Sequence, residues 1–346
     1  MSLSRRRFLQ MMGASAAATA MTPTVLTRVA EAVQASGAWY PVVWLQGQSD
    51  TGCSESLLNT LAPNVVDLVT EIVDLKFHQT VMAAQGHLAI SVLDDLLASE
   101  EKFLLVVEGA VPTAHGGAYS TMGERDGKKV TFLQWVQDLG ARAEAVVAFG
   151  TCSAFGGIPA AEGNVTGASP VTDVLPEQKV IRLPSCPGRP HHLVGTLAHL
   201  KLYGMPELDE LRRPKMFFSL TNHDNCERRP FFERGDYAHH FGEHKCMYLL
   251  GCKGPITHND CSQHQWNSRV NWPVRGGSPC VGCAHPLFGG PRGNALYEQL
   301  PEIQVPGFAG LEAKADKAAI VLAGAAAAGI AAHAVGRAVT KNKKES

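Results

Sequence analysis

Short apolar runs alternate with segments of helical spacing over the first part of the chain. Four runs are apolar enough to form buried strands, at residues 40–46, 103–107, 145–149 and 179–183. Four other segments place apolar residues every three or four positions, as on one face of a helix, at residues 56–75, 86–99, 132–142 and 191–202. Pro63 interrupts the first of these helical segments. This alternation predicts a parallel sheet that is covered by helices on both faces.

The organisation changes near residue 210. Beyond Pro214 the periodicity fades, and Pro, Gly, Asn, His and Cys become frequent. Six of the nine cysteines lie between Cys226 and Cys283. Clustered cysteines at short spacings are typical of metal sites, so this second part is predicted to be rich in loops and held together by metal.

Composition narrows the class of protein. The chain has 346 residues, of which 45% are hydrophobic and 18% are charged, which is enough for two domains and a large buried core. A formal net charge of −1 argues against a nucleic-acid-binding protein. An odd number of cysteines also excludes complete pairing into disulfides within the chain.

The N-terminus carries an export motif. Residues 4–10 read Ser-Arg-Arg-Arg-Phe-Leu-Gln, which departs from the twin-arginine pattern only at its last position. A weakly apolar, Ala-rich stretch follows, and a cleavage site is expected near Ala35. Residues 1–35 are therefore interpreted as a twin-arginine signal and left out of the fold. The alternative is a basic N-terminal tail without a targeting role.

The C-terminus carries a candidate membrane anchor. Residues 318–336 have no formal charge, and as a helix they would span roughly 28 Å against a hydrocarbon core of about 30 Å. Basic residues dominate the tail at 337–346, which predicts a cytoplasmic C-terminus and an exported body. Residues 301–317 would form a linker. The alternative is a soluble Ala-rich helix that packs on a partner, and His333 within it is interpreted as a packing residue rather than a haem ligand.

Three cysteines each follow a predicted strand. They are Cys53, Cys152 and Cys186. Open parallel sheets bind ligands at the carboxyl ends of their strands, so these thiols are expected to converge. The alternative is three unrelated buried thiols. Glu108 also follows a strand and is open to two interpretations, as a proton-transfer group or as a solvated or turn-forming carboxylate.

Three thiolates leave a cubane iron–sulfur cluster one ligand short. Asp50 lies three positions before Cys53, where a C-x-x-C pair would have its first thiolate. A carboxylate oxygen can bind iron and would alter the reduction potential of the cluster. We therefore expect Asp50 to be the fourth ligand, while a turn-forming aspartate or an open iron position remain alternatives. Ser49, Thr51 and Glu55 are weaker candidates.

The second part supplies two further ligand sets. One consists of a histidine and three cysteines, namely His223, Cys226, Cys246 and Cys252. The other consists of Cys261, Cys280 and Cys283, and Pro273 between them has no side-chain donor atom to add. Zinc would explain a set of four but not a set of three beside it, so iron–sulfur clusters are favoured. Six nearby histidines receive no ligand role: His239, His240, His244, His258, His264 and His285.

Several motifs together resemble the small subunit of nickel–iron hydrogenases over about residues 40–290. The matching pieces are the run Trp44–Ser56, Val107-Glu108-Gly109, Gly150-Thr151-Cys152, His223-x2-Cys226, Gly251-Cys252-Lys253-Gly254-Pro255, Asn271-Trp272-Pro273-Val274 and Cys280-x2-Cys283. The resemblance implies a flavodoxin-like α/β domain at 36–210 and an irregular cluster-binding domain at 211–300. A C-terminal transmembrane helix would follow.

The resemblance also implies a chain of three clusters. The proximal 4Fe–4S set is Cys53, Cys152 and Cys186 with Asp50, the medial 3Fe–4S set is Cys261, Cys280 and Cys283, and the distal 4Fe–4S set is His223, Cys226, Cys246 and Cys252. The family usually has cysteine at Asp50 and glutamate at Ser49. Oxygen-tolerant members with a six-cysteine proximal cluster carry extra cysteines at the positions of Gly52 and Gly157, so this chain cannot build that cluster. A proximal set of three cysteines and one aspartate resembles hydrogenases of actinobacterial type.

The function implied by this resemblance is electron transfer in a membrane-bound, H2-oxidising uptake hydrogenase. The nickel–iron centre would lie in a large-subunit partner, and a membrane cytochrome b or another quinone-linked partner would accept the electrons. The body would lie on the exported, periplasmic face of the cell membrane. An electron-transfer protein like that of complex I is an alternative that residues 223–283 argue against. A hydrogen-sensing regulatory subunit is another, and the twin-arginine segment argues against it.

Overall fold

The structure is a computed structural model. It describes residues 41–61, 64–68, 73–267 and 269–289, together with short pieces at 296–297, 303–304, 312–313, 326 and 328–333. The predicted export signal at 1–35 and the tail at 337–346 lie outside the described residues, as does most of the linker at 301–317 and of the span at 318–336.

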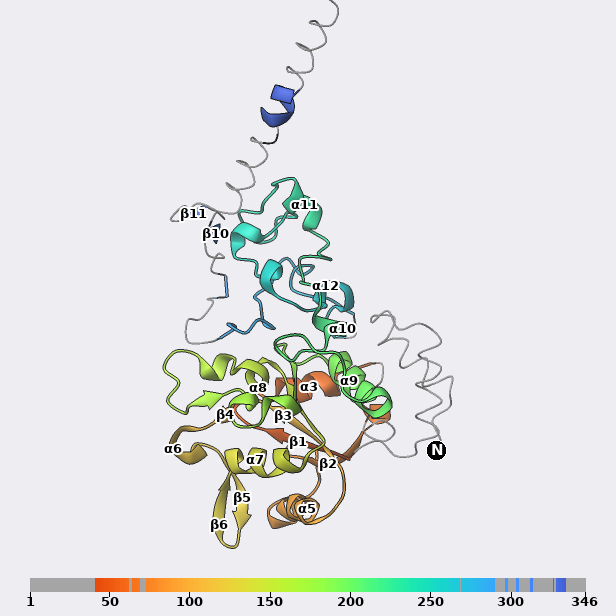
Figure 1. The fold of residues 1–346 in the computed structure, drawn as a ribbon, viewed down its shortest axis with the longest axis vertical. Helices are drawn as coiled ribbons and strands as arrows, with labels where there is room; N and C mark the ends of the chain where they lie inside the picture. The colour runs from red at the N-terminus through yellow and green to blue at the C-terminus, as the bar shows by residue number, and fades with distance from the viewer. Residues whose placement is uncertain are drawn as a thin grey trace, which may run out of the picture.

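A five-stranded parallel sheet forms the centre of the first part (Figure 1). Its strands lie in the order β2-β1-β3-β7-β9, which is the order of flavodoxin-like sheets. Their bounds are β1 Pro41–Gln46, β2 Asp74–His78, β3 Leu104–Glu108, β7 Ala145–Phe149 and β9 Val180–Leu183. Neighbouring strands are in register, for example Gln46 with Glu108 and Glu108 with Phe149, so their carboxyl ends meet along one edge. The predicted α/β class with a parallel sheet is confirmed.

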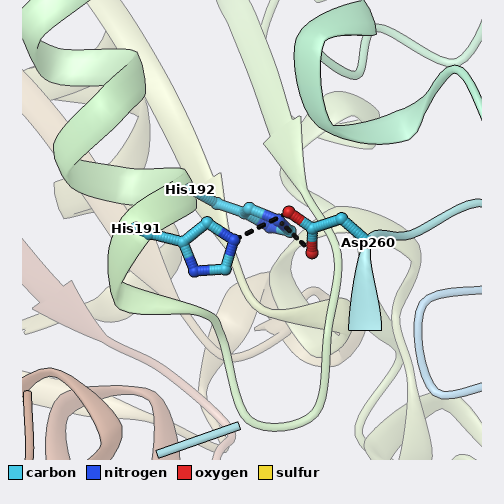
Figure 2. Close-up of side chains that lie close together, drawn as sticks. All are labelled: His191, His192 and Asp260. Carbon is cyan, nitrogen blue, oxygen red and sulfur yellow. Dashed lines mark hydrogen bonds and ion pairs between the residues drawn. The ribbon is translucent and has the colours of Figure 1, made fainter. Parts of the chain in front are cut away.

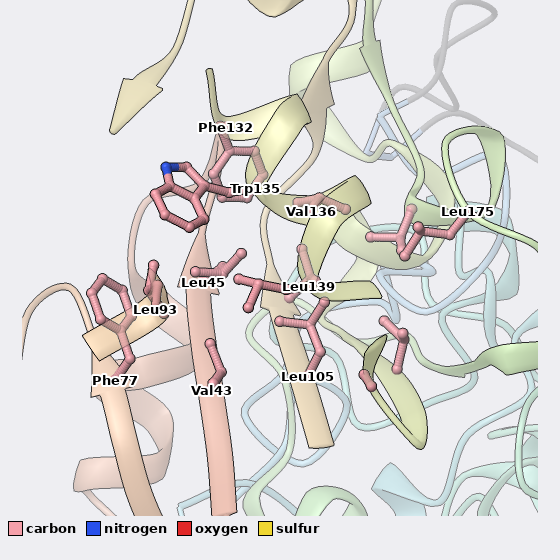
Figure 3. Packing of buried hydrophobic residues seen from close by; sticks show 14 of the residues in the cluster. Val43, Leu45, Phe77, Leu93, Leu105, Phe132, Trp135, Val136, Leu139 and Leu175 are labelled. Atoms are coloured by element: carbon pink, nitrogen blue, oxygen red, sulfur yellow. The ribbon is translucent and has the colours of Figure 1, made fainter. Parts of the chain in front are cut away.

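Helices cover both faces of the sheet because successive strand residues point to opposite sides. Val43 and Leu45 of β1 pack with α5 (His87–Ala98) and α7 (Phe132–Arg142) on one face. Figure 3 shows side chains of α7, Trp135 and Leu139 among them, pointing toward these strands. Val42 and Trp44 pack with the helices on the other face, which are α3 (Gly52–Leu58), α9 (Pro190–Tyr203) and α10 (Lys215–Phe218).

Most of the predicted elements lie within a residue or two of their observed bounds, and the helix at 132–142 and the strand at 145–149 match theirs. The helix expected at 56–75 is wrong. The helical segments there are α3 and the single turn α4 (Val65–Asp67), and β2 begins at Asp74, so the end of that segment is an unforeseen strand. Over a stretch as short as β2, the apolar spacing of a helix cannot be distinguished from that of a half-buried edge strand.

A β-hairpin was also not anticipated. It consists of β5 (Thr121–Arg125) and β6 (Lys128–Thr131), which pair antiparallel around Asp126 and Gly127. Asp-Gly between two strands is a strong hairpin signal, so the sequence contained this information. Two further pairs, β4 (Val111–Pro112) with β8 (Ala168–Ser169) and β10 (Ile303–Gln304) with β11 (Glu312–Ala313), are only two residues long.

The second part has little regular structure, as predicted. Over residues 219–289 it contains only short helical turns, namely α11 (Arg229–Glu233), η5 (Tyr248–Leu250), η6 (Gly254–Ile256) and α12 (Cys261–His264), within the residues that the structure describes. Residues after strands β7 and β9 connect it to the first part, since Thr151 Oγ1 donates to the backbone carbonyl of Cys283 and Ser185 Oγ lies 4.0 Å from Cys283 Sγ. It therefore packs against the carboxyl edge of the sheet.

Among the described residues, no helix has both the length and the apolar character that crossing a bilayer requires.

Candidate metal centres

Three cysteines from separate strand ends gather at the carboxyl edge of the sheet. Cys53 lies in α3 after β1, Cys152 lies in α8 (Thr151–Phe155) after β7, and Cys186 follows β9. Burial raises the pKa of Cys53 well above its usual value, and the charges of Glu108, Cys152 and Cys186 raise it further. Burial likewise raises the pKa of Cys152 to about 11 and that of Cys186 to about 12. A thiolate at neutral pH therefore requires a strong counter-charge, which a bound metal supplies.

Glycines allow the backbone to lie directly against these sulfurs. A Cβ at Gly150 would lie 2.5 Å from Cys53 Sγ, and one at Gly157 would lie 2.9 Å from Cys152 Sγ. Both glycines have a positive φ, which L side chains rarely adopt. The backbone N–H of Gly188 donates to Cys53 Sγ at 3.1 Å. A pocket of thiols, small residues and a backbone donor fits an inorganic cluster with thiolate ligands.

Asp50 lies beside this group and also shapes the turn before α3. Its Oδ1 accepts from the backbone N–H of Gly52 at 2.9 Å, so the turn-forming interpretation is confirmed. Its charge raises the pKa of Cys152 and that of Cys186, each after a larger effect of burial. Asp50 is exposed to solvent beside the thiols. Its role in the turn is therefore established, and iron ligation stays a prediction.

Glu108 is fully buried, so its interpretation as a solvated carboxylate is wrong. The backbone N–H groups of Cys53 and Ser54 donate to Oε1 at 3.0 and 3.2 Å. Oε2 accepts from the Ser54 hydroxyl and, at 3.0 Å, from Trp44 Nε1. Glu108 thereby fixes the N-terminus of α3, and with it the position of Cys53.

The second group of thiols consists of Cys261, Cys280 and Cys283, all of them buried. Burial raises the pKa of all three thiols, that of Cys283 to about 12, and the charge of Cys261 raises the pKa of Cys280 and of Cys283 further. Nitrogen donors point at two of the sulfurs. Arg189 Nη1 and Trp266 Nε1 lie 3.2 and 3.4 Å from Cys261 Sγ, and Asn222 Nδ2 lies 3.6 Å from Cys280 Sγ.

Sequence reasoning missed these three donors. No spacing rule connects Arg189, which precedes α9, with a cysteine 72 residues later. Hydrogen bonds donated to sulfur favour the thiolate form, most of all from a cation such as Arg189, so these donors fit a thiolate-ligated cluster.

The third group consists of His223, Cys226, Cys246 and Cys252. Burial raises the pKa of Cys246 to about 11, and the charges of Cys252 and Cys226 raise it further. The backbone N–H of His223 donates to the carbonyl of Gly254, and a Cβ at Gly254 would lie 3.4 Å from Cys252 Sγ, so His223 lies near the same thiols. Burial, and then the charge of Arg229, lowers the pKa of His223, so its imidazole is neutral at pH 7, as metal ligation requires.

The second group adjoins each of the other two. Ser185, next to Cys186 of the first group, has its Oγ 4.0 Å from Cys283 Sγ. Lys253, next to Cys252 of the third group, donates its backbone N–H to the carbonyl of Cys280 at 2.7 Å. The charge of Cys252 also raises the pKa of Cys280, after a larger effect of burial.

The first part of the chain suits both a hydrogenase small subunit and an electron-transfer protein like that of complex I. Comparison with known proteins distinguishes these two interpretations. Residues 51–200 match the family model described as NADH ubiquinone oxidoreductase, 20 Kd subunit, which by itself would also suit an electron-transfer protein of complex I. Residues 218–294 match the family model that describes the C-terminal part of the NiFe/NiFeSe hydrogenase small subunit. The chain belongs to the nickel–iron hydrogenase small-subunit family. It is therefore part of an oxidoreductase, a hydrogenase.

Full-length relatives agree with this family. The chain is 39% identical over 305 residues to the periplasmic [NiFeSe] hydrogenase small subunit of Desulfomicrobium baculatum, covering 83% of this chain and 96% of that one. It is 36% identical over 353 residues to the quinone-reactive Ni/Fe-hydrogenase small chain of Wolinella succinogenes, covering 99% and 98%.

A solved structure agrees as well. The fold superposes with a TM-score of 0.71 on a chain of the actinobacterial-type NiFe-hydrogenase from Ralstonia eutropha H16, at 28% identity over 76% of this chain and 83% of that one. The small-subunit family therefore extends over both parts of the chain.

Proposed function

We propose that this chain is the electron-transferring small subunit of an H2-oxidising uptake hydrogenase. When bound, three iron–sulfur clusters would supply one-electron redox sites along its length. The proximal set is Asp50, Cys53, Cys152 and Cys186, the medial set is Cys261, Cys280 and Cys283, and the distal set is His223, Cys226, Cys246 and Cys252. The observation that supports this most directly is that the medial thiol group adjoins both of the others, through Ser185 beside Cys186 and Lys253 beside Cys252.

The chain's own residues bind, orient and desolvate these sites. Glycines let the backbone lie against the proximal sulfurs, Glu108 fixes the start of α3, and buried N–H donors point at the medial sulfurs. Hydrogen bonds and burial around a cluster are the means by which a protein sets its reduction potential. The nickel–iron centre would lie in a large-subunit partner, since the three proposed sets use all nine cysteines of this chain.

Asp50 is the residue at which this chain departs most from the common family pattern. We propose that it ligates the proximal cluster and helps activity to persist in air. Gly52 and Gly157 offer no thiol for a six-cysteine cluster, and a side chain at Gly157 would meet the backbone of Cys152 at 2.9 Å. If the unmodified enzyme lost its activity in air, the proposal that Asp50 helps activity to persist in air would be wrong.

Substitution of Asp50 tests the ligation. Asp50→Cys is expected to change the proximal EPR and Mössbauer signals, because a thiolate would replace a carboxylate oxygen on one iron. Glu124→Gln is the control, since it neutralises an exposed carboxylate of β5, a strand without cysteines, and is expected to leave both spectra unchanged. Unchanged spectra in Asp50→Cys would refute ligation.

The location proposed for this subunit is the exported face of the cell membrane. The twin-arginine motif, the uncharged segment at 318–336 and the basic tail support export, anchoring and a cytoplasmic C-terminus. One relative is named periplasmic and another quinone-reactive, which supports a quinone-linked acceptor such as a membrane cytochrome b.

Co-purification tests the function as a whole. The chain, expressed with its large subunit, is expected to yield a complex that oxidises H2 with an artificial acceptor, in air as well as under nitrogen. Each small subunit is expected to carry about eleven iron atoms, from two four-iron clusters and one three-iron cluster. A complex without H2 uptake, or a small subunit without iron, would contradict the proposal.

A further inference from the structure

A buried carboxylate lies next to the medial thiols and receives an unusual number of nitrogen neighbours. Asp260 directly precedes Cys261, and its side chain is only 7% exposed. His191 Nε2 and His264 Nδ1 lie 2.8 and 2.7 Å from Oδ2, and His192 Nε2 lies 3.0 Å from Oδ1. Figure 2 shows His191 and His192 of α9 pointing toward this carboxylate. The three histidines thus surround Asp260 and fix its orientation.

Arg189 connects this network to the medial sulfur. Its side chain is 4% exposed, and its Nε lies 3.6 Å from Asp260 Oδ1. Nη2 donates to the backbone carbonyl of Gln265, and Nη1 donates to Cys261 Sγ at 3.2 Å. The hydrogen bond to Gln265 and the ion pair with Asp260, which leaves Nε without a hydrogen bond among the described residues, therefore place the planar guanidinium with its remaining edge at the sulfur.

The same side chains could be considered as a separate metal site, since ligand atoms of His191, His192 and Asp260 lie within 4.8 Å of one another. The geometry favours hydrogen bonds instead. The nitrogen–oxygen distances are those of direct hydrogen bonds, and the Arg189 cation lies against the same carboxylate. Nδ1 of His192 has no partner among the described residues, whereas a ligating histidine usually donates through its second nitrogen.

We propose that Asp260 and its three histidines are positioning residues that hold Arg189 against Cys261 and thereby raise the reduction potential of the medial cluster. This inference rests on the proposed function, because it requires a cluster on Cys261, Cys280 and Cys283. A directed N–H and a positive charge at a ligand sulfur stabilise the reduced, more negative state of a cluster. Burial strengthens the effect, because little water screens the charge.

The test is a redox titration of the medial EPR signal in the purified two-subunit complex. Arg189→Met keeps much of the length of the side chain but removes its charge and donors. It is expected to lower the equilibrium constant for reduction about tenfold, which is about 59 mV for one electron. Arg275→Met is the control, because it removes a cation of the same part that pairs with Glu227 at the surface. The control is expected to leave the potential unchanged.

The sign of the shift in Asp260→Asn tests the positioning role. Removal of a negative charge beside a cluster would by itself raise the potential, whereas loss of the anchor of Arg189 lowers it. A lower potential supports the proposal, and a higher one shows that Asp260 acts only through its own charge and overturns it. If Arg189→Met loses its cluster, Arg189→Lys carries the test, since it keeps the charge without the planar fork. A wild-type potential in Arg189→Lys would then rule out the directed donor.

Two outcomes distinguish a failure of this inference from a failure of the proposed function on which it rests. Absence of any three-iron EPR signal in the unmodified complex would remove the medial cluster, and with it the proposed function. A normal signal whose potential does not move in Arg189→Met would overturn only the inference. Metal analysis of the complex completes the test, because one equivalent of a metal other than nickel or iron that is lost in His192→Ala would establish a metal site in place of the hydrogen-bonded network.

Discussion

The sheet part and the cluster part of this chain hold their sulfurs in different ways. At residues 41–210, two large hydrophobic clusters pack on the faces of a parallel sheet, and Cys53 is one member among many aliphatic and aromatic side chains. At residues 219–289 the hydrophobic cluster is small, with Cys261 and Cys280 beside Trp272 and a few aliphatic side chains, and Cys226 and Cys252 pack against it. The first part therefore has a hydrocarbon core of its own, whereas the second is expected to rely on what its thiols bind.

Removal of iron is expected to produce the largest difference in stability between the two parts. Without metal, nearly all the thiols of residues 219–289 would be protonated, buried and unpaired, so this part is expected to lose protection from amide hydrogen exchange by at least about a hundredfold, or about 2.7 kcal/mol. The strands of the sheet serve as the internal control and should keep most of their protection. Mass spectrometry of holo and apo samples measures both, and equal loss in the two parts would count against the distinction.

Truncation of a core side chain should destabilise the sheet part more than residues 219–289. Trp135 is fully buried on α7, and its Nε1 donates to the backbone carbonyl of Met122 at 2.8 Å. Trp135→Ala is expected to cost about 3–5 kcal/mol through the cavity that it leaves. Thermal unfolding and exchange at β3 and β7 measure the loss. Trp135→Phe is the milder comparison, and a loss confined to residues 219–289 would contradict the assignment of this core.

The proximal site should respond to a single methyl group. Gly150→Ala would place Cβ 2.5 Å from Cys53 Sγ at a φ of 92°, so we expect strain and overlap of about 1–3 kcal/mol and a loss of proximal iron. Gly163→Ala is the matched control, because its φ is 83° and nothing among the described residues lies within 4 Å. Iron analysis and the proximal EPR signal read the result. Equal iron content in the two variants would show that the space beside Cys53 is not used.

Mild acid should lower the free energy of unfolding of the sheet part, by a smaller amount than the changes above. Burial lowers the pKa of His78 to about 4, below the value of about 6.5 expected in the unfolded chain. The contribution of the neutral imidazole is therefore complete above pH 6.5 and is lost as the pH falls toward 4. Between pH 7 and pH 5 we expect a loss of about 1–2 kcal/mol. His78→Gln should flatten this dependence in denaturant unfolding, and an unchanged slope would exclude His78 as its source.

The predictability of the elements differed for physical reasons. Residues 132–142 were predicted to their bounds because their apolar spacing is strongly one-sided and Thr131 caps the first turn. The strand β2 was missed because it is short and lies at the sheet edge, where three of its five residues are only partly buried. The hairpin at Asp126 and Gly127 was missed although its turn signal is present in the sequence.

The residues of the candidate site also divide into those that the sequence predicts and those that it does not. The sequence by itself determined the nine thiols and the alternation that brings Cys53, Cys152 and Cys186 to one edge, because side-chain chemistry and strand direction are local properties, and it predicted their grouping into three sets. Only the tertiary structure decided that Glu108 is buried against α3, and that Arg189 lies beside Asp260 and donates to Cys261 Sγ. These contacts join residues more than 50 positions apart, and no sequence period connects them.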